Sequence, residues 1–286
     1  LSAAYGAVGL VDDYAKIKKK ENAGLTPRQK LVLQILVAAV FILVLFLESD
    51  GLPSLMIPFT GISIDLPWPV YIIFAAFVIV GADNAVNLTD GIDGLAASVT
   101  VPVAVFFAAV GARIGNTGVT IFAGALAGGL LGFLIYNFNP AKVFMGDTGS
   151  TFLGFMLSSI SIYGLFKMYA IISFAVPFLV LGLPIFDICF AVIRRVSKGQ
   201  SPMHADRGHV HHRLIDMGFS QKQAVAIAYM LSAILGMAAV VLTNDGEMKA
   251  LIFIGAVIVV GAIGVLVIFH RHPDKQDETT EKPSAC

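Results

Sequence analysis

Residues 31–47 read LVLQILVAAVFILVLFL, an almost uninterrupted apolar run. A helix that crosses the hydrocarbon core of a bilayer needs about 20 mostly apolar residues. Similar runs recur along the 286 residues, which are 57% hydrophobic and only 13% charged, whereas soluble domains average about 25% charged residues. This composition excludes a soluble globular enzyme, a disordered chain and a nucleic-acid binder that uses a basic face. It predicts an all-α polytopic transmembrane helix bundle.

The apolar runs predict eight full spans and a partial first helix at residues 1–11. The eight spans are 31–47, 70–82, 95–112, 118–136, 151–166, 169–193, 223–243 and 249–269. We expect residues 1–269 to form one integral membrane domain and the polar residues 270–286 to form a disordered tail. Because the chain starts at Leu1 inside an apolar stretch, we also expect upstream sequence to be missing.

The few charged residues are sorted between the two sides of the predicted bundle. Alternation of the spans assigns the segments 12–30, 83–93, 137–150, 194–222 and the tail to one side. That side carries 16 of the 19 Lys and Arg residues. The excess of positive charge in cytoplasmic loops makes it the cytoplasmic side.

Aspartates concentrate in three of these cytoplasmic segments. The segments are VDDYAKIKKK with Asp12 and Asp13, GADNAVNLTDGIDGLA with Asp90 and Asp93, and NFNPAKVFMGDTGS with Asp147. On a helix, the spacing of three would place Asn87, Asp90 and Asp93 on one face. Clustered carboxylates at a membrane surface suit a hard cation such as Mg²⁺, with Mn²⁺ as the alternative. Solvated loop carboxylates remain the other explanation.

The fourth segment, SPMHADRGHVHHRL, carries four histidines among acidic and basic residues. Protonatable imidazoles beside arginine favour phosphate recognition through Arg207, His209, His211 and His212. Metal ligation and a structural role stay open, although the HxHH spacing is not that of a structural zinc site.

Three further polar or aromatic positions, Lys16, Asn137 and Phe144, are candidates whose roles stay open. Lys16 follows Asp12 by four residues and either turns inward to a phosphate or sets topology with Lys18, Lys19 and Lys20. Asn137 could cap a helix. Phe144 stacks on a base or anchors its loop in the membrane interface.

These four segments, in this order, resemble the polyprenyl-phosphate N-acetylhexosamine-1-phosphate transferase family. The quoted motifs VDDYAK, NAVNLTDGIDGLA, NPAKVFMGDTGS and HADRGHVHHRL carry the resemblance, which extends over the whole chain except the tail. It implies a Mg²⁺-dependent enzyme at the cytoplasmic face of the bacterial cytoplasmic membrane. The partners would be a UDP-sugar, undecaprenyl phosphate and the lipid bilayer, with no nucleic acid; a homodimer is left open. Members usually have ten or eleven spans, which agrees with a missing N-terminus.

The resemblance implies roles for the motif residues. It assigns catalysis to Asp12, Asp13, Asp90 and Asp93, and metal binding to Asp147 with help from Asp90. The implied substrate-binding residues are Lys16, Asn84, Asn87, Asn137, Phe144, Arg207, His209, His211 and His212. Phe144 would stack on uracil.

The histidine loop separates two branches of this family. Its sequence resembles the GlcNAc-1-phosphate transferases, particularly the teichoic-acid linkage-unit type, rather than the PIHHHFE string expected of the peptidoglycan translocase that uses UDP-MurNAc-pentapeptide. That translocase is the alternative function. A membrane transporter is a more distant one, disfavoured because the acidic clusters lie at one face rather than at mid-membrane.

Overall fold

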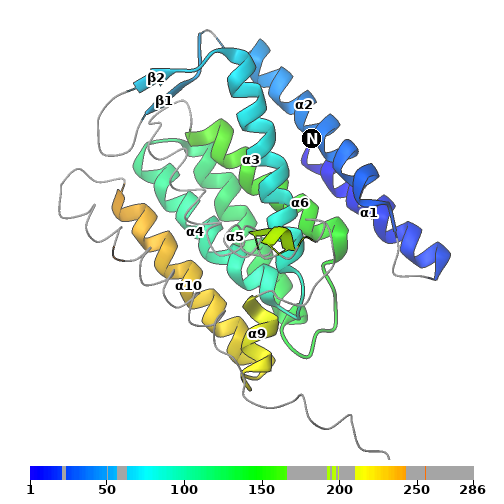
Figure 1. Cartoon of the computed structure of the whole chain (residues 1–286). Coiled ribbons are helices and arrows are strands. Elements are labelled where there is room, and N and C mark those ends of the chain that lie inside the picture. Colours follow the sequence, from blue (N-terminus) through cyan, green and yellow to red (C-terminus); the bar gives the residue numbers. More distant parts are fainter. Residues whose placement is uncertain are drawn as a thin grey trace, which may run out of the picture.

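Long helices lying side by side build the protein, as the computed structural model in Figure 1 shows. The described residues are 1–20, 24–49, 51–56, 63–165, 192–193, 195–197, 199, 210–242 and 255. The helices are α1 (Ser2–Lys19), α2 (Pro27–Leu47), α3 (Trp68–Thr89), α4 (Leu95–Arg113), α5 (Thr117–Asn137), α6 (Gly146–Ser159), a π-helix η1 (Ile160–Leu165), α9 (Val210–Asp216) and α10 (Gln221–Leu242). The prediction that the chain is mainly helical is confirmed for the described residues.

Four helices of the described part are long and apolar enough to cross a membrane: α2, α3, α4 and α5. The predicted spans 151–166 and 223–243 correspond to α6 with η1 and to α10. The predicted spans 169–193 and 249–269 and the tail 270–286 lie outside the described residues, apart from isolated positions. The structure therefore supports four of the eight spans.

A short antiparallel ribbon interrupts the helical pattern at the end of the bundle where α2 leads into α3. Strand β1 (Ser54–Met56) pairs with β2 (Ser63–Asp65), with Leu55 opposite Ile64. The sequence predicted only a connection here. Three paired residues per strand give too little periodicity to separate a strand from a loop.

Two helices are longer than their apolar runs. The first helix, predicted as 1–11, extends to Lys19, and the third, predicted as 70–82, runs from Trp68 to Thr89. Both continue through polar residues because those side chains face other helices rather than lipid: Asp12 and Asp83 are buried. Hydropathy counts residues without regard to the face they occupy, so it ended the first helix too early. The run 70–82 is too short to span a bilayer, and its expected extension into the flanking residues is confirmed.

The prediction that Asp90 and Asp93 share one face of a helix is wrong. Helix α3 ends at Thr89, Asp90 is its C-cap residue, and α4 begins after Gly94 at φ 79°. This left-handed conformation favours glycine. A turn at residues 90–94 therefore connects α3 to α4.

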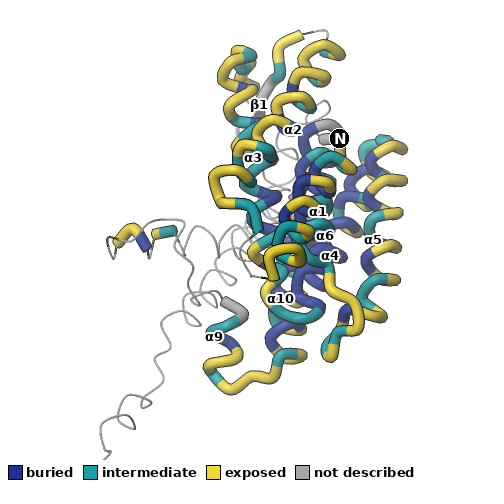
Figure 2. The backbone as a smooth tube through the Cα atoms, turned by 90° about the vertical axis from the view of Figure 1, so that its right-hand side faces the viewer, coloured by how far each residue is buried: buried dark blue, intermediate teal, exposed yellow. Residues whose placement is uncertain are grey.

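The helices pack α1 on α6, α6 on α3, α4 on α5 and α10 on α4. Figure 2 shows buried residues on their inward faces and exposed residues on the outer sides of helices such as α5. Glycines allow the closest approaches: a Cβ at Gly9 would overlap the Asp147 backbone, and one at Gly154 would overlap the Asp83 backbone. Backbones this close fix α6 against both α1 and α3.

Replacing Gly154 with alanine should destabilise the fold because its Cβ would collide with the backbone of α3. Overpacking of this kind costs about 1–3 kcal/mol, so the thermal unfolding midpoint in detergent should fall. Gly128→Ala is the matched control, since a Cβ there meets no atom of the described residues within 4 Å. Equal midpoints for the two variants would contradict the close packing.

Candidate functional site

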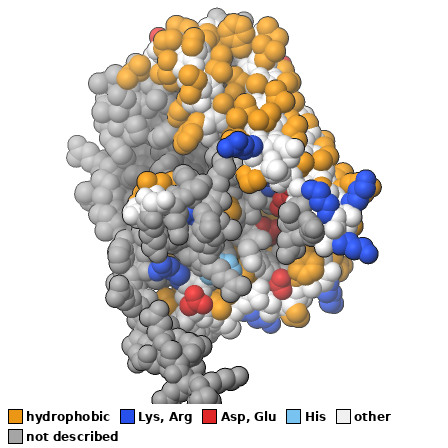
Figure 3. Space-filling view, turned by 45° about the vertical axis from the view of Figure 1, so that its right-hand side comes forward, with side chains coloured by type: hydrophobic (Ala, Val, Ile, Leu, Met, Phe, Trp, Pro, Cys, Tyr) orange, Lys and Arg blue, Asp and Glu red, His pale blue; other side chains and the backbone are white. Residues whose placement is uncertain are grey.

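Polar side chains from four helices meet at the end of the bundle opposite the β-ribbon. They come from the last turns of α1, the first turn of α2, the end of α3 and the first turn of α6. On the face shown in Figure 3, hydrophobic side chains cover the upper part, while Lys, Arg, Asp and Glu gather lower down. The sequence prediction that the motif segments share one end of the molecule is confirmed for the first three segments.

Asp13 caps the N-terminus of α6, which lacks a side-chain cap of its own. Its carboxylate accepts hydrogen bonds from the backbone N–H groups of Asp147 at 3.2 Å and Thr148 at 2.9 Å, and from the Thr148 hydroxyl at 2.7 Å. The first N–H groups of a helix have no intrahelical partners, and its dipole favours a negative charge there. The pairing attaches α1 to α6.

Asp147 is the centre of the polar cluster. One carboxylate oxygen, Oδ2, lies 2.9 Å from both Lys16 Nζ and Lys30 Nζ, and Oδ1 accepts a hydrogen bond from Asn87 at 3.0 Å. Burial alone would raise the pKa of Asp147, but its interactions with Asp12, Lys30 and Asn87 hold it well below the usual range. The group is therefore a carboxylate at neutral pH.

Asp12 lies on the other side of Lys16 and is only 3% exposed. It forms an ion pair with Lys16 at 2.6 Å and accepts a hydrogen bond from the Leu25 backbone at 2.6 Å. Burial alone would lower the pKa of Lys16, but hydrogen bonds to Asp12 and Asp147 raise it above its ordinary value. Lys16 therefore turns inward to the carboxylates, although its side chain remains 33% exposed, and its role in phosphate binding stays a prediction.

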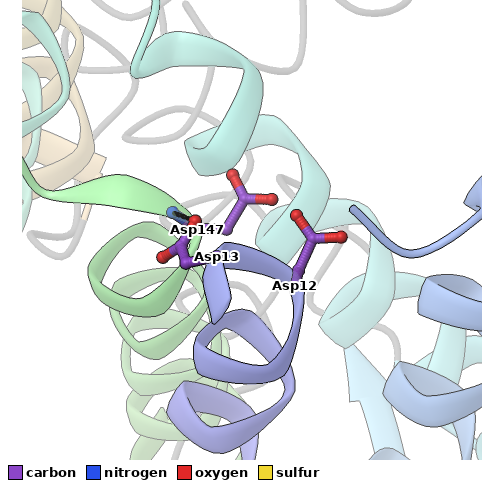
Figure 4. Close-up of side chains that lie close together, drawn as sticks. All are labelled: Asp12, Asp13 and Asp147. Atoms are coloured by element: carbon purple, nitrogen blue, oxygen red, sulfur yellow. Dashed lines mark hydrogen bonds between the residues drawn. The ribbon is translucent and has the colours of Figure 1, made fainter. Parts of the chain in front are cut away.

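The three aspartates fit a divalent cation. Asp12, Asp13 and Asp147 each offer a carboxylate oxygen, and these atoms lie within 4.8 Å of one another; Figure 4 shows them at the junction of α1 and α6. Hard oxygen donors of this kind suit Mg²⁺ or Mn²⁺. The Lys16 ammonium lies 2.6–3.7 Å from all three carboxylates, so this position already attracts positive charge.

Asp90 and Asp93 occupy different environments in the turn between α3 and α4. Burial, followed by the charges of Asp147, Asp13 and Asp93, raises the pKa of Asp90 to about 6. Asp93 instead accepts hydrogen bonds from the Asn139 side chain at 3.1 Å and the Ala141 backbone at 3.0 Å. Asp90 therefore interacts through charge with Asp147 and Asp13 of the cluster, whereas the hydrogen bonds of Asp93 hold the α5–α6 loop.

Among the predicted substrate-binding residues, too, some contact the aspartate cluster and others hold loops or helices together. Asn87 donates a hydrogen bond to Asp147, while Asn84, about one helical turn before Asn87, donates a hydrogen bond to the Gln34 side chain. Asn137 is buried, accepts a hydrogen bond from Gly94 and donates one to Val143, so it joins two loops. It does not simply cap its own helix.

Phe144 makes no hydrogen bond to the aspartate cluster among the described residues, and most of the histidine segment lies outside the described part. Phe144 is 73% exposed. His211 and His212 belong to α9, but the side chain of His211, and all of Arg207 and His209, lie outside the described part.

Lys30 and Gln34 were missed by the sequence reasoning. Lys30 contacts both Asp147 and, at 3.3 Å, Asn87, and Gln34 is fully buried. A signal was available: Gln34 interrupts the apolar run 31–47, and Lys30 precedes it by four residues, which places both on one helix face.

These features define a bundle of membrane-type helices with a site of carboxylates and lysines at one end. The chain matches the family described as Glycosyl transferase family 4 over residues 1–165. It belongs to that family, and the resemblance drawn from the motifs is confirmed at this level.

Three proteins similar to this chain carry two different names. The chain is 36% identical over 239 residues to "Probable undecaprenyl-phosphate N-acetylglucosaminyl 1-phosphate transferase" of Bacillus subtilis (strain 168), covering 83% of this chain and 63% of that protein. It is 37% identical over 241 residues to "Phospho-N-acetylmuramoyl-pentapeptide-transferase" of Nostoc punctiforme, covering 82% and 64%. The protein of that name from Listeria monocytogenes serovar 1/2a is 46% identical over 160 residues, covering 56% and 49%. The chain thus spans about half to two thirds of the length of these relatives.

Asp90→Asn should stabilise the protein at pH 8 and not near pH 4. A carboxyl whose pKa is higher in the folded than in the unfolded chain loses stability when it ionises, here between about pH 4 and 6. The amide removes this cost, which is on the order of 1–3 kcal/mol. Thermal unfolding in detergent with EDTA at both pH values measures it.

The exposed Asp65→Asn variant controls for the loss of one negative charge far from the cluster. An Asp90→Asn variant less stable than wild type at pH 8 would contradict the environment assigned to Asp90.

Proposed function

We propose that the protein transfers GlcNAc-1-phosphate from UDP-GlcNAc to undecaprenyl phosphate, releasing UMP and forming undecaprenyl-diphospho-GlcNAc. The observation that carries the proposal is the cluster of Asp12, Asp13 and Asp147 around Lys16 and Lys30. It lies at one end of a helix bundle in a member of Glycosyl transferase family 4. A polar site at a membrane surface suits a reaction between a lipid phosphate and a water-soluble nucleotide sugar.

Positioning and charge neutralisation account for most of the catalysis of phosphoryl transfer. In the proposed reaction, a phosphate oxygen of the lipid attacks the β-phosphorus of the nucleotide sugar. A new P–O bond forms, and the bond from the β-phosphorus to the bridging oxygen breaks, so UMP leaves. Lys16 and Lys30 supply two ammonium groups on one side of Asp147, where they would bind phosphate oxygens.

Asp147 would hold Mg²⁺ within the cluster that it forms with Asp12 and Asp13, and Asp90, whose pKa the charge of Asp147 helps to raise, would assist. The ion, when bound, would neutralise charge that develops on the phosphate oxygens. The low pKa of Asp147 keeps that carboxyl ionised for this role. Asp90, with a pKa of about 6, is ionised at neutral and alkaline pH, so activity should decline as the pH falls below about 6.

Asp12 and Asp13 would orient the lipid phosphate rather than deprotonate it. A phosphate monoester has its second pKa near 6, so it is largely a dianion at neutral pH and needs no strong base. Asp13 is already hydrogen-bonded to α6. Asp12 forms an ion pair with Lys16, so Asp12 would orient the ammonium group of this lysine toward the lipid phosphate.

The remaining assigned residues would form the nucleotide-sugar site. Phe144 is exposed in the α5–α6 loop, where a ring is free to stack on uracil. Asp93 and Asn137 hold the turns and loops around it. The other residues proposed to contact the sugar nucleotide are Asn84, Asn87, Arg207, His209, His211 and His212.

The concentration of Lys and Arg in the segments around the site supports a cytoplasmic active site in the bacterial membrane. Undecaprenyl phosphate and the bilayer are the proposed partners.

Transfer of phospho-MurNAc-pentapeptide is the second candidate function. Relatives of both names cover similar shares of the chain, 83% and 82%. The HADRGHVHHRL segment favours the GlcNAc donor. The two activities use the same acceptor and release UMP, so they differ only in how the donor is recognised.

The purified protein in detergent should release UMP from UDP-GlcNAc and undecaprenyl phosphate, and not from UDP-MurNAc-pentapeptide. Equal concentrations of the two donors, assayed separately with the same lipid, give the comparison. Preference for the pentapeptide donor would replace the first candidate with the second. Transport of a solute without UMP release would contradict both.

Asp147→Asn should abolish both Mn²⁺ binding and UMP release, because the variant loses the charge shared by the metal and the two lysines. Metal ions contribute several kcal/mol of charge stabilisation, which corresponds to a fall in turnover of at least about 100-fold. Electron paramagnetic resonance of added Mn²⁺ measures binding independently of activity.

The exposed Asp216→Asn variant, on α9, is the matched control. Wild-type turnover in Asp147→Asn would exclude the metal assignment.

A further inference from the structure

A second polar layer lies one helical turn deeper in the bundle than the aspartate cluster. It consists of Gln34 on α2 and Asp83 on α3, both with no exposed surface, and Asn84 beside them. Neither Gln34 nor Asp83 has a part in the reaction proposed above. Polar groups buried among membrane-type helices are costly and usually serve function.

Directed hydrogen bonds join the members of this layer. Gln34 Nε2 donates to Asp83 Oδ2, and Asn84 Nδ2 donates to Gln34 Oε1 at 3.0 Å. The Tyr5 hydroxyl on α1 donates to the Gln34 backbone carbonyl at 2.7 Å. Three helices are therefore joined at the level of Gln34.

The spacing connects this layer to the site. Gln34 follows Lys30 by four residues, and Asp83 precedes Asn87 by four, so each partner lies about one turn from a residue that contacts Asp147. The Gln34–Asp83 hydrogen bond therefore fixes the axial register of α2 against α3. That register sets where Lys30 and Asn87 meet the carboxylate.

Helix α6 is fitted to the same point. Gly154 lies against the backbone of Asp83, and it follows Asp147 by seven residues, about two turns. The helix that carries Asp147 is thus placed by contact with Asp83, while the helices carrying Lys30 and Asn87 are placed by the hydrogen bond of its side chain.

The energetics argue against stability as the purpose of this pair. Asp83 Oδ1 has no hydrogen-bond partner among the described residues, and an unsatisfied buried acceptor costs about 1–3 kcal/mol. Well-packed apolar residues often replace a buried charged or polar pair without loss of stability. The pair supplies direction, which an apolar contact lacks.

We propose that Gln34 and Asp83 are positioning residues that hold Lys30 and Asn87 in register against Asp147. The inference rests on the proposed function. It assigns this pair a role in the reaction through other residues, without contact to substrate.

Three variants of the full chain separate direction from packing. Asp83→Asn keeps an oxygen that accepts from Gln34, so turnover should stay within about threefold of wild type. Asp83→Leu removes the acceptor, and we expect about 10–100-fold weaker Mn²⁺ binding together with lower turnover, as for lost outer-sphere contacts at metal sites. The double variant Gln34→Met/Asp83→Leu should regain the unfolding midpoint but neither Mn²⁺ affinity nor turnover.

Thr100→Val is the matched control, because it removes a buried hydroxyl that bonds only within α4 among the contacts described. Recovery of turnover and Mn²⁺ affinity in the double variant would overturn the inference, as would equal losses in Asp83→Asn and Asp83→Leu. A wild-type protein that releases no UMP would overturn the proposed function and this inference with it. An active wild type with unaffected Asp83→Leu would overturn the inference alone.

Discussion

The carboxylate of Asp147 imposes the main constraint on the structure. It is half-buried and ionised, with Asp12 and Asp13 nearby, so the helices around it must supply compensating positive charge. Lys16 comes from α1 and Lys30 from α2, and the N-terminal dipole of α6 contributes to the same end. Removing any of these helices would leave uncompensated negative charge in a region of low dielectric, which explains why the site and the packing of the bundle are inseparable.

Much of this arrangement could be predicted from sequence, because hydropathy and motif order carry it. The apolar runs predicted α2, α4 and α5 to within a few residues of their ends. Alternation of spans correctly brought Asp12 and Asp147 to the same end of the bundle, although more than 130 residues separate them. Such a prediction works because a helix that crosses a bilayer can end only at one of two surfaces.

What could not be predicted depends on which way a side chain faces. Lys30 looks like a residue that sets topology until α2 is packed beside α3 and its ammonium meets Asp147. Gln34 looks like an isolated irregularity in an apolar run. The turn at Asp90–Gly94 depends on backbone conformation at one glycine. The shortened prediction for the first helix has the same origin, because Asp12 in its polar end is buried against protein rather than exposed to water.

Close approach of the helices is important because no hydrophobic driving force acts between helices in lipid. Association then depends on van der Waals contact and hydrogen bonds, which small residues make possible. Gly9 and Gly154 bring α1 and α3 into backbone contact with α6 near the two polar layers. The glycines thus permit distances at which hydrogen bonds between side chains of different helices can form.

The two adjacent aspartates of α1 illustrate how such packing divides chemically identical groups. Neighbouring residues on a helix point about 100° apart, so Asp12 and Asp13 make their hydrogen bonds to different segments, although both carboxylates lie within 4 Å of the Lys16 ammonium. Asp12 pairs with Lys16 on its own helix and accepts a hydrogen bond from the Leu25 backbone just before α2, while Asp13 faces α6 and accepts hydrogen bonds from its first N–H groups. One carboxylate controls a cation and the other fixes the helix that carries Asp147. A pair of aspartates in sequence is therefore a bridge between two neighbouring helices, and a substitution at Asp13 would act on the site by moving Asp147.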